Sequence, residues 1–402
     1  MRRAAKITHM PPSSEVYNRV FAAIQPQRLI DMAVRLIEVP SPTRNGAAVA
    51  DRFAQLLGDS GLEVQRVPAG WATAPAVVAR YQTGRPGRTL QFNGHLDTVH
   101  LPFVPPRVED GQLYGSGASD MKGGVAAMCE AAWALRDSGC LPAGGILITG
   151  HDLHESPWGD GSQVDGLIDG GYLGDAVLLP EYVSDRLPVI GRGLAILEIR
   201  ITRVGEPVHE VLGGLDQPSV IRAGARLIAR LEQWDHQLSA RQHPLGGRES
   251  CFVGQIHAGE IYNQAPIELE MSGTRRWLPG TSPGDVKRVY EQICSAVAEE
   301  TGTQVDGKFT FVRDACELDA SASIVSCFQA AHEEVTGCPL PEGPKPFVDD
   351  GNTFMSRGGI PAISHGPRAL GAHTLNEQVA VDELVRVAKV YAATAIEFCG
   401  AA

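Results

Sequence analysis

The sequence predicts an α/β protein: a mostly parallel sheet flanked by helices, with a smaller ferredoxin-like α+β domain inserted into it. Three observations lead to this fold class. Helical and strand-like apolar patterns alternate along the first half of the chain, strands that alternate apolar and polar residues begin near Gly191, and the first pattern returns after Asp314. With 402 residues, 43% of them hydrophobic, the chain is long enough for two domains.

The first segment alternates helices with short strands. Apolar residues recur with helical spacing from Gln27 to Ile37 and from Ala47 to Leu57, and the Ala-rich stretch from Gly123 to Leu135 is also helical. Short apolar runs bounded by Gly and Pro are strand candidates, at 77–81, 89–93, 145–149 and 176–179. This alternation favours a parallel sheet covered by helices on both faces.

The middle segment has the pattern of a small α+β domain. Residues 194–204 alternate apolar and polar side chains, as in a strand with one face in solvent. A helix, two strands, a helix and a strand follow, at 219–238, 251–258, 267–277, 282–301 and 307–312. This order is the split βαβ unit of a ferredoxin-like domain. We therefore predict an inserted domain over residues 193–313.

The α/β pattern resumes after the insertion. A helix at 323–336, a strand at 360–364 and a helix at 381–398 follow Asp314. The first and third segments are expected to complete one sheet, so residues 1–192 and 314–402 together form the larger domain.

Composition excludes several classes of protein. The 47 acidic and 35 basic residues give a net charge of -12, which repels a nucleic-acid backbone. No stretch approaches the ~18 apolar residues of a membrane span, and no signal peptide follows the basic start. The eight cysteines are scattered without a C-x-x-C pair. We expect a cytoplasmic protein with reduced thiols and neither nucleic acid nor membrane as a partner.

Five segments offer histidines or carboxylates near the ends of predicted strands and loops. The candidate side chains are His95 and Asp97, Asp120, His154 and Glu155, Glu181, and His373. In open α/β sheets ligands bind at the carboxyl ends of the strands, and a carboxylate beside an imidazole orients the ring for metal binding. Any metal here must be held by nitrogen and oxygen ligands, which suits Zn, Mn or Co.

Simpler interpretations apply to each segment taken alone. His95 could be satisfied by its own turn, and Asp120 could be a helix N-cap. His154-Glu155 does not continue as H-E-x-x-H, because Trp158 occupies the position three after Glu155. Gly117 to Met121 lacks the final glycine of G-x-S-x-G, which disfavours a serine hydrolase.

Taken in order, the motifs resemble the M20 family of metallopeptidases and amidohydrolases, which includes succinyl-diaminopimelate desuccinylase and carboxypeptidase G. The matching stretches are GHLDTV, YGSGASDMKGG, LLPE, GEPVHE, YNQAP followed by RRWLPG, and GAHTLNE, and they span roughly residues 30 to 400. The resemblance implies a metal-dependent exopeptidase-like catalytic domain over 1–192 and 314–402. It also implies that 193–313 is a lid through which the protein forms a homodimer.

The resemblance assigns roles to individual residues. It implies one or two divalent ions, Zn, Mn or Co, held by His95, Asp120, Glu155, Glu181 and His373, with Asp120 bridging. Asp97 matches the orienting aspartate. His209 matches the lid histidine that polarises the scissile carbonyl across the dimer, and Asn263 and Arg276 match positions that hold the substrate. A bidentate guanidinium would suit a substrate carboxylate.

One departure leaves the catalytic base open. The family usually carries Asp-Glu-Glu where this chain has Leu153-His154-Glu155. If the two triplets are aligned position by position, Glu155 is a metal ligand and His154 takes the position of the base. If the alignment is shifted by one residue, Glu155 is the base and one metal is short of a ligand. Three carboxylates in place of four favour a mononuclear site or a weaker second metal.

The predicted activity is metal-assisted hydrolysis of an amide-type C–N bond in a small molecule such as an N-acyl amino acid. Glu155 or His154 would take the proton of the water. Two alternatives stay open: a hydrolytic deaminase acting on an activated aromatic or amidine amine, possible with a single metal, and a small-molecule-binding protein without activity.

Overall fold

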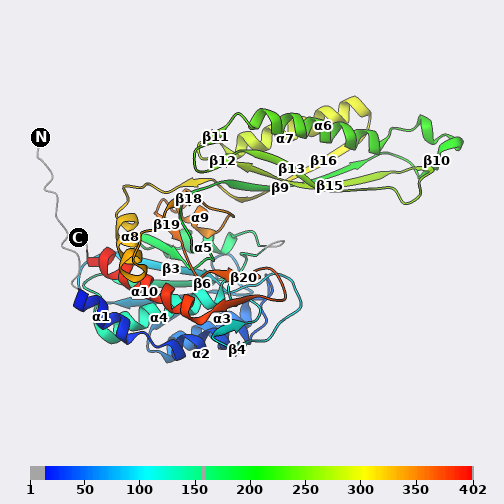
Figure 1. Cartoon of the computed structure of the whole chain (residues 1–402). Helices are drawn as coiled ribbons and strands as arrows, with labels where there is room; N and C mark the ends of the chain where they lie inside the picture. The colour runs from blue at the N-terminus through cyan, green and yellow to red at the C-terminus, as the bar shows by residue number, and fades with distance from the viewer. Residues whose placement is uncertain (1–13, 156–158, 401–402) are drawn as a thin grey trace, which may run out of the picture. The chain divides into compact units, whose positions relative to one another are not determined.

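A computed structural model describes residues 14–155 and 159–400 (Figure 1). The chain divides into two compact units. One comprises the described residues up to Val189 together with Leu318–Gly343 and the chain from Asp349 onward. The other comprises Ile190–Glu317 and the short segment Pro344–Val348, whose place in this unit no sequence pattern indicated.

The first unit is built on a six-stranded sheet. In sheet order the strands are β1 (Glu63–Val67), β2 (Ala76–Gln82), β6 (Gly145–His151), β3 (Thr89–His95), β7 (Ala176–Leu179) and β19 (Ala362–Ser364). The pairs β6–β3, β3–β7 and β7–β19 are parallel, and β2 is antiparallel to both β1 and β6. The predicted mostly parallel sheet is confirmed.

Helices cover both faces of this sheet because successive strand residues point to opposite sides. Val77 and Ala79 belong to the large core, whereas Ala76 and Val78 belong to a smaller cluster on the other face. The large core is formed with α1 (Ser14–Ala23), α2 (Pro26–Ile37), α3 (Ala47–Asp59), α4 (Lys122–Ser138), α8 (Ser323–Thr336) and α10 (Val381–Gly400). The opposite face carries α5 (Ser162–Asp169) and α9 (Asp350–Ser356).

Two small sheets complete the strand pairing outside the main sheet. In the first, β20 (Ala369–Leu370) and β21 (Gln378–Ala380) join β5 (Gln112–Tyr114) and β4 (Arg107–Glu109). Val379 pairs with Leu113 there, which brings the C-terminal segment beside the Gly-rich loop that follows β5. The second consists of β17 (Cys316–Glu317), β8 (Leu187–Gly191) and β18 (Glu342–Pro344).

The second unit is an antiparallel sheet with two helices packed on it. The sheet order is β13 (Ser250–Ala258), β15 (Glu268–Trp277), β9 (Gly193–Thr202) and β16 (Gln304–Arg313), and the helices are α6 (Val220–Leu238) and α7 (Pro283–Thr301). Ala195, Leu197, Ile199 and Ile201 alternate along β9 and form its core face. Strand and helix order match the ferredoxin-like pattern that the sequence predicts.

Short elements extend this unit. β10 (Val208–His209) pairs with β14 (Gln264–Ala265), followed in the chain by the single turns η1 (Glu210–Leu212) and η2 (Gly214–Asp216). β11 (Gln242–His243) and β12 (Gly247–Arg248) form a hairpin before β13. Across the described part of the chain, no helix combines the length and the apolar character needed to span a bilayer.

Candidate metal centre

The strand ends of the main sheet bring the first ligands together. His95 and His151 are the last residues of β3 and β6, and they pair directly in the parallel register. Glu181 lies two residues beyond the end of β7, the other neighbour of β3. All three side chains are buried. They therefore meet at the carboxyl edge of the sheet, where the sequence places the site.

Asp120 reaches this edge because the C-terminal segment holds the Gly-rich loop. The Glu377 carboxylate accepts backbone N–H bonds from Gly117, Ser119 and Asp120 at 2.8, 2.9 and 2.8 Å. Pairing of β21 with β5 places Glu377 within reach of the loop. Asp120 is not a helix N-cap, since α4 is capped at Met121 without a side-chain bond. Glu377 is a positioning residue that the sequence reasoning left without a role.

The Asp120 carboxylate lies between two imidazoles. Its Oδ1 is 3.2 Å from Nε2 of His95, and its Oδ2 is 3.0 Å from Nε2 of His373. Burial alone would raise the pKa of Asp120, but the bonds to His373 and His95 outweigh it and hold the pKa well below its usual range. A carboxylate with one oxygen toward each histidine has the geometry of a bridging group.

Asp97 fixes the loop that carries His154 and Glu155. Its Oδ2 accepts hydrogen bonds from the backbone N–H groups of both residues, at 3.0 and 2.9 Å, and from the Thr43 hydroxyl at 2.8 Å. His95 turns Nδ1 toward the Asp97 carbonyl oxygen, at 3.0 Å, whereas Oδ1 of the carboxylate is 3.6 Å away. Asp97 thus contacts the imidazole through its backbone and the loop through its side chain.

Glu155 completes a cluster on the side of His373. Its Oε2 is 3.3 Å from Nε2 of His373, and its side chain is buried. Burial and the nearby charge of Asp120 raise the pKa of Glu155. The His373 imidazole is 48% exposed, and its bonds to Asp120 and Glu155 raise its pKa to about 10. The group formed by Asp120, Glu155 and His373 is therefore in contact with solvent through His373.

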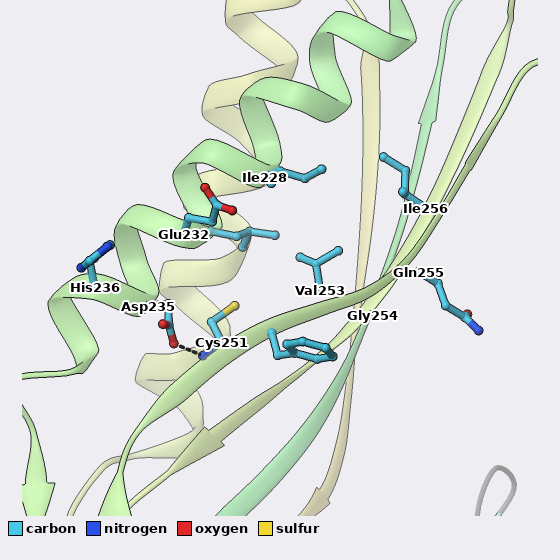
Figure 2. A pocket seen from close by; sticks show the side chains of 11 residues that line it. Ile228, Glu232, Asp235, His236, Cys251, Val253, Gly254, Gln255 and Ile256 are labelled. Atoms are coloured by element: carbon cyan, nitrogen blue, oxygen red, sulfur yellow. Dashed lines mark hydrogen bonds between the residues drawn. The ribbon is translucent and has the colours of Figure 1, made fainter.

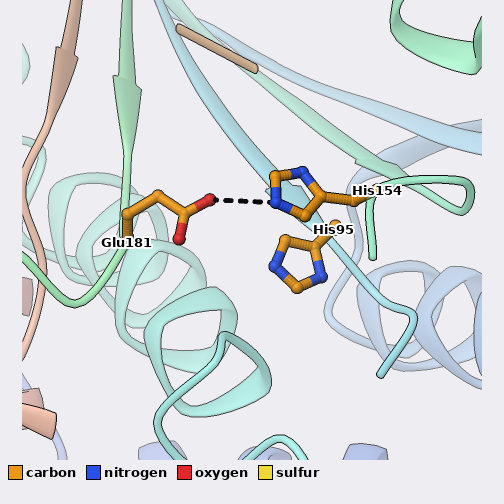
Figure 3. Close-up of side chains that lie close together, drawn as sticks. All are labelled: His95, His154 and Glu181. Carbon is orange, nitrogen blue, oxygen red and sulfur yellow. Dashed lines mark ion pairs between the residues drawn. The ribbon is translucent and has the colours of Figure 1, made fainter. Parts of the chain in front are cut away.

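His154 lies beside His95 and Glu181 in a second group of side chains (Figure 3). Its ring is stacked on that of His95, with centroids 4.0 Å apart and an interplanar angle of 9°. Its Nε2 is 3.7 Å from Oε1 of Glu181, and its Nδ1 is 2.8 Å from Oδ2 of Asp350. Burial and His95 lower the pKa of His154, but Asp350 and Glu181 outweigh them and raise it to about 9. The same carboxylates favour any cation placed here.

Asp350 is a site residue that the sequence reasoning missed. It is the first residue of α9, whose N-cap Asp349 accepts the Gly351 N–H at 2.8 Å. Oδ2 of Asp350 lies 3.1 Å from Nε2 of His151 as well as 2.8 Å from His154. The only local signal was an aspartate pair before a glycine, which is typical of a helix start.

The residues present fit a divalent ion. Two groups have ligand atoms within 4.8 Å of one another: His95 with His154 and Glu181, and His95 with Asp120 and Glu155. Oε1 of Glu181 is buried and has no hydrogen-bond partner among the described residues, and burial raises the pKa of Glu181 to about 8. Buried carboxylates need a compensating charge, and imidazole with carboxylate is the donor set of Zn, Mn and Co sites.

Comparison with known proteins identifies the family. Residues 91–397 match peptidase family M20/M25/M40. The chain belongs to this family. It is 27% identical over 397 residues to the succinyl-diaminopimelate desuccinylase of Alkalilimnicola ehrlichii, covering 90% of this chain and 96% of that protein. It is 24% identical over 429 residues to the N-formyl-4-amino-5-aminomethyl-2-methylpyrimidine deformylase of Bacillus subtilis, covering 93% and 95%.

The fold of this M20 protein is shared with solved structures. A metallo-carboxypeptidase of the M20 family from Sulfolobus solfataricus superposes with a TM-score of 0.77 at 15% identity, covering 92% of this chain and 98% of that one. The predicted family, fold class and enzyme class are confirmed: the protein is a metal-dependent hydrolase acting on amide-type C–N bonds.

The predicted residues His209, Asn263 and Arg276 of the M20 pattern belong to the second unit. Nε2 of His209 and Nδ2 of Asn263 are 2.9 Å apart, next to the β10–β14 pair. Arg276 lies near the C-terminal end of β15, opposite Ser250 of β13 and Leu194 of β9. In the first unit, Trp158 and His100 are further candidates for lining the pocket: Trp158 lies outside the described residues, and Nε2 of His100 is 2.9 Å from the Thr43 carbonyl oxygen.

Proposed function

We propose that the protein removes an acyl group from the nitrogen of a small molecule. The observation that supports this most directly is the buried cluster of His95, Asp120, Glu155 and Glu181 at the carboxyl edge of the sheet. The names of both curated relatives describe the removal of a short acyl group, succinyl in one and formyl in the other. An N-acyl amino acid or a similar N-acylated amine is the substrate class that fits best.

The ligands we propose are His95, Asp120, Glu155, Glu181 and His373, for one or two ions of Zn, Mn or Co. The chemistry that such ions supply is Lewis-acid activation of a water molecule and of the scissile carbonyl group. Asp97 holds the 154–155 loop through two N–H bonds, so it positions Glu155 at the cluster. Glu155 or His154 accepts the proton of the attacking water and returns it to the leaving nitrogen.

Arg276 is proposed to bind a carboxylate of the substrate. Among the described residues no carboxylate forms an ion pair with its guanidinium, and burial together with the nearby Arg192 lowers its pKa. A half-buried guanidinium without a counterion is suited to an anionic ligand, which it can bind through two parallel hydrogen bonds. An acyl amino acid carries such a carboxylate.

The second unit is proposed to form a homodimer. β13 is an edge strand, and Phe252 and Ile256 on it are 64% and 47% exposed. A pocket of about 650 Å³ lies between β13 and α6, with Ile228 and Val253 in its wall (Figure 2). An apolar edge strand is a ready surface for a second copy of the same strand.

His209 and Asn263 are proposed to act on the substrate of the partner subunit. Their end of the second unit carries strongly exposed apolar residues: Val211, Leu212 and Leu215 are 73%, 76% and 83% exposed, and Tyr262 is 99% exposed. Apolar surface of this extent is typical of a contact region. A paired imidazole and amide in that region could donate hydrogen bonds to a carbonyl oxygen that gains charge during hydrolysis.

We also propose a reducing, cytoplasmic compartment without nucleic-acid or membrane partners. None of the eight cysteines forms a disulfide bond in the described part of the chain. The net charge of -12 disfavours the binding of polyanions such as nucleic acids.

A substrate panel tests the proposed function. The purified chain, loaded with Zn²⁺, Mn²⁺ or Co²⁺, is incubated with N-formyl, N-acetyl and N-succinyl amines and amino acids, and the free amine is measured. We expect turnover of at least one N-acyl compound. Release of ammonia from aminated aromatics or amidines, with every N-acyl compound left intact, would instead support the deaminase.

A further inference from the structure

We propose that His154 is a metal ligand, oriented by Asp350, and that it forms with His95 and Glu181 a three-residue set for one ion. This inference rests on the proposed metal-dependent function and deepens it, because it names the residues that bind the first ion. It also gives a chemical role to His154, whose role the sequence left open.

The hydrogen bond to Asp350 sets which nitrogen of His154 can bind a metal. A carboxylate only accepts hydrogen bonds, so Nδ1 of His154 donates to Oδ2 of Asp350, at 2.8 Å. The neutral ring then carries its proton on Nδ1 and its lone pair on Nε2. A carboxylate that binds the second ring nitrogen in this way is the usual partner of a metal-ligating histidine.

Nε2 of His154 points into the cluster. It lies 3.7 Å from Oε1 of Glu181, a buried oxygen for which the described part of the chain offers no hydrogen-bond partner (Figure 3). That separation is too long for a hydrogen bond but leaves room for an ion between the two atoms. A ligand atom of His95 lies within 4.8 Å of those of His154 and Glu181.

The position of Asp350 is itself determined by the fold. Asp350 begins α9, which is fixed by the capping box of Asp349 and Asn352. Oδ2 of Asp350 also lies 3.1 Å from Nε2 of His151, the buried end of β6. The carboxylate is therefore held between two imidazoles, and it is a positioning residue for His154.

This assignment separates the metal ligands of the cluster from the residue that accepts the proton. Two histidines and one glutamate are a common protein ligand set of a catalytic zinc ion, which keeps a further position for water or substrate. With His154 as the third ligand, the ion bound by His95 and Glu181 does not require Glu155. Glu155 is then available as the proton acceptor, although the chain has only one acidic side chain where the family usually has two.

Metal titration of the full chain tests this assignment without measuring activity. The wild type and the variants His154→Gln and Asp350→Asn are stripped of metal and titrated with Co²⁺, following heat and the visible absorption spectrum. His236→Gln, an exposed histidine on α6, is the matched control. We expect both site variants to bind the first ion about 10- to 100-fold more weakly, and His154→Gln to change the Co²⁺ spectrum.

The outcomes separate this inference from the proposed function. If His154→Gln binds Co²⁺ with the affinity and spectrum of the wild type, His154 is not a ligand and the inference is overturned. Asp350→Asn keeps the His154 ring, so normal binding by that variant would remove the role of Asp350 as the group that orients it. If the metal results hold but the loaded wild type hydrolyses no N-acyl compound, the ligand set stands and the proposed function fails.

Discussion

Glu377 accepts the backbone N–H of Asp120 at 2.8 Å, although 257 residues separate them in the chain. The contact depends on the pairing of β21 with β5, which lays the C-terminal segment against the Gly-rich loop. Because the same carboxylate also binds the N–H groups of Gly117 and Ser119, one side chain fixes the whole loop. The position of the Asp120 carboxylate is therefore set by a residue that is not itself in either group of candidate ligands.

Replacing Glu377 with Ala should weaken metal binding without unfolding the protein. The loop would lose the acceptor of three N–H groups, so Asp120 would no longer be held between His95 and His373. We expect about a 10- to 100-fold loss of affinity for Zn²⁺, measured by calorimetry. Asp382→Asn, an exposed carboxylate at the start of α10, is the control. Wild-type affinity in Glu377→Ala would show that the loop holds its shape unaided.

Replacing Glu155 with Gln should reduce turnover while the first ion stays bound. An amide cannot accept the proton of the attacking water, and a general base contributes about 10²- to 10⁴-fold to the rate. We expect kcat to fall by that factor with a wild-type content of the first ion, measured by elemental analysis. Near-normal kcat would exclude Glu155 as the base, and loss of the first ion would make it an essential ligand.

The elements of the main sheet were predictable because they are apolar and buried. GILIT at 145–149 lies within β6, where all seven residues from Gly145 to His151 are buried. The edge strand β1 was missed, since its sequence EVQRV contains no apolar run and its side chains are exposed or half-buried. A strand that is stabilised by its partner, rather than by its own burial, leaves little periodic signal.

The candidate site was predictable where its residues follow strands. His95 and Glu181 come directly after apolar runs, so the parallel sheet brings them together. Asp350 was not predictable, because its contact with His154 spans 196 residues and depends on how α9 packs against the sheet. The Asp97 carboxylate likewise binds backbone N–H groups, which every residue except proline has, so no side-chain pattern marks its partners.

Burial of Lys122 should make stability depend on pH. Its Nζ is enclosed and donates to the Val39 carbonyl oxygen at 3.0 Å, and burial lowers its pKa from 10.5 to about 7. Between these two values the unfolded chain holds a proton that the folded chain has released, so the free energy of unfolding rises with pH across this window. As the pH falls from 10.5 to about 7, the folded protein therefore loses this part of its free energy of unfolding.

Lys122→Met is the variant that tests this linkage. Methionine keeps a long flexible side chain but cannot titrate, so the part of the slope due to Lys122 should disappear. We expect the variant to gain stability relative to the wild type at pH 7 and to lose that advantage at pH 10, measured by urea unfolding. Lys389→Met, at a half-buried lysine on α10, is the matched control for the substitution itself. Parallel pH profiles for Lys122→Met and the wild type would contradict the prediction.

Dimerisation through β13 predicts that a charge on this strand separates the subunits. Ile256→Glu places a carboxylate on an edge strand that a second copy would approach. In a two-fold contact the same strand of each subunit carries the new charge, so the two carboxylates repel each other across the interface. We expect the wild type to sediment as a dimer at micromolar concentration and the variant as a monomer. Val108→Glu, a 45% exposed position on β4 in the first unit, is the control. A variant that sediments like a dimeric wild type would move the interface away from β13, and a monomeric wild type would end the homodimer proposal together with the role of His209 across it.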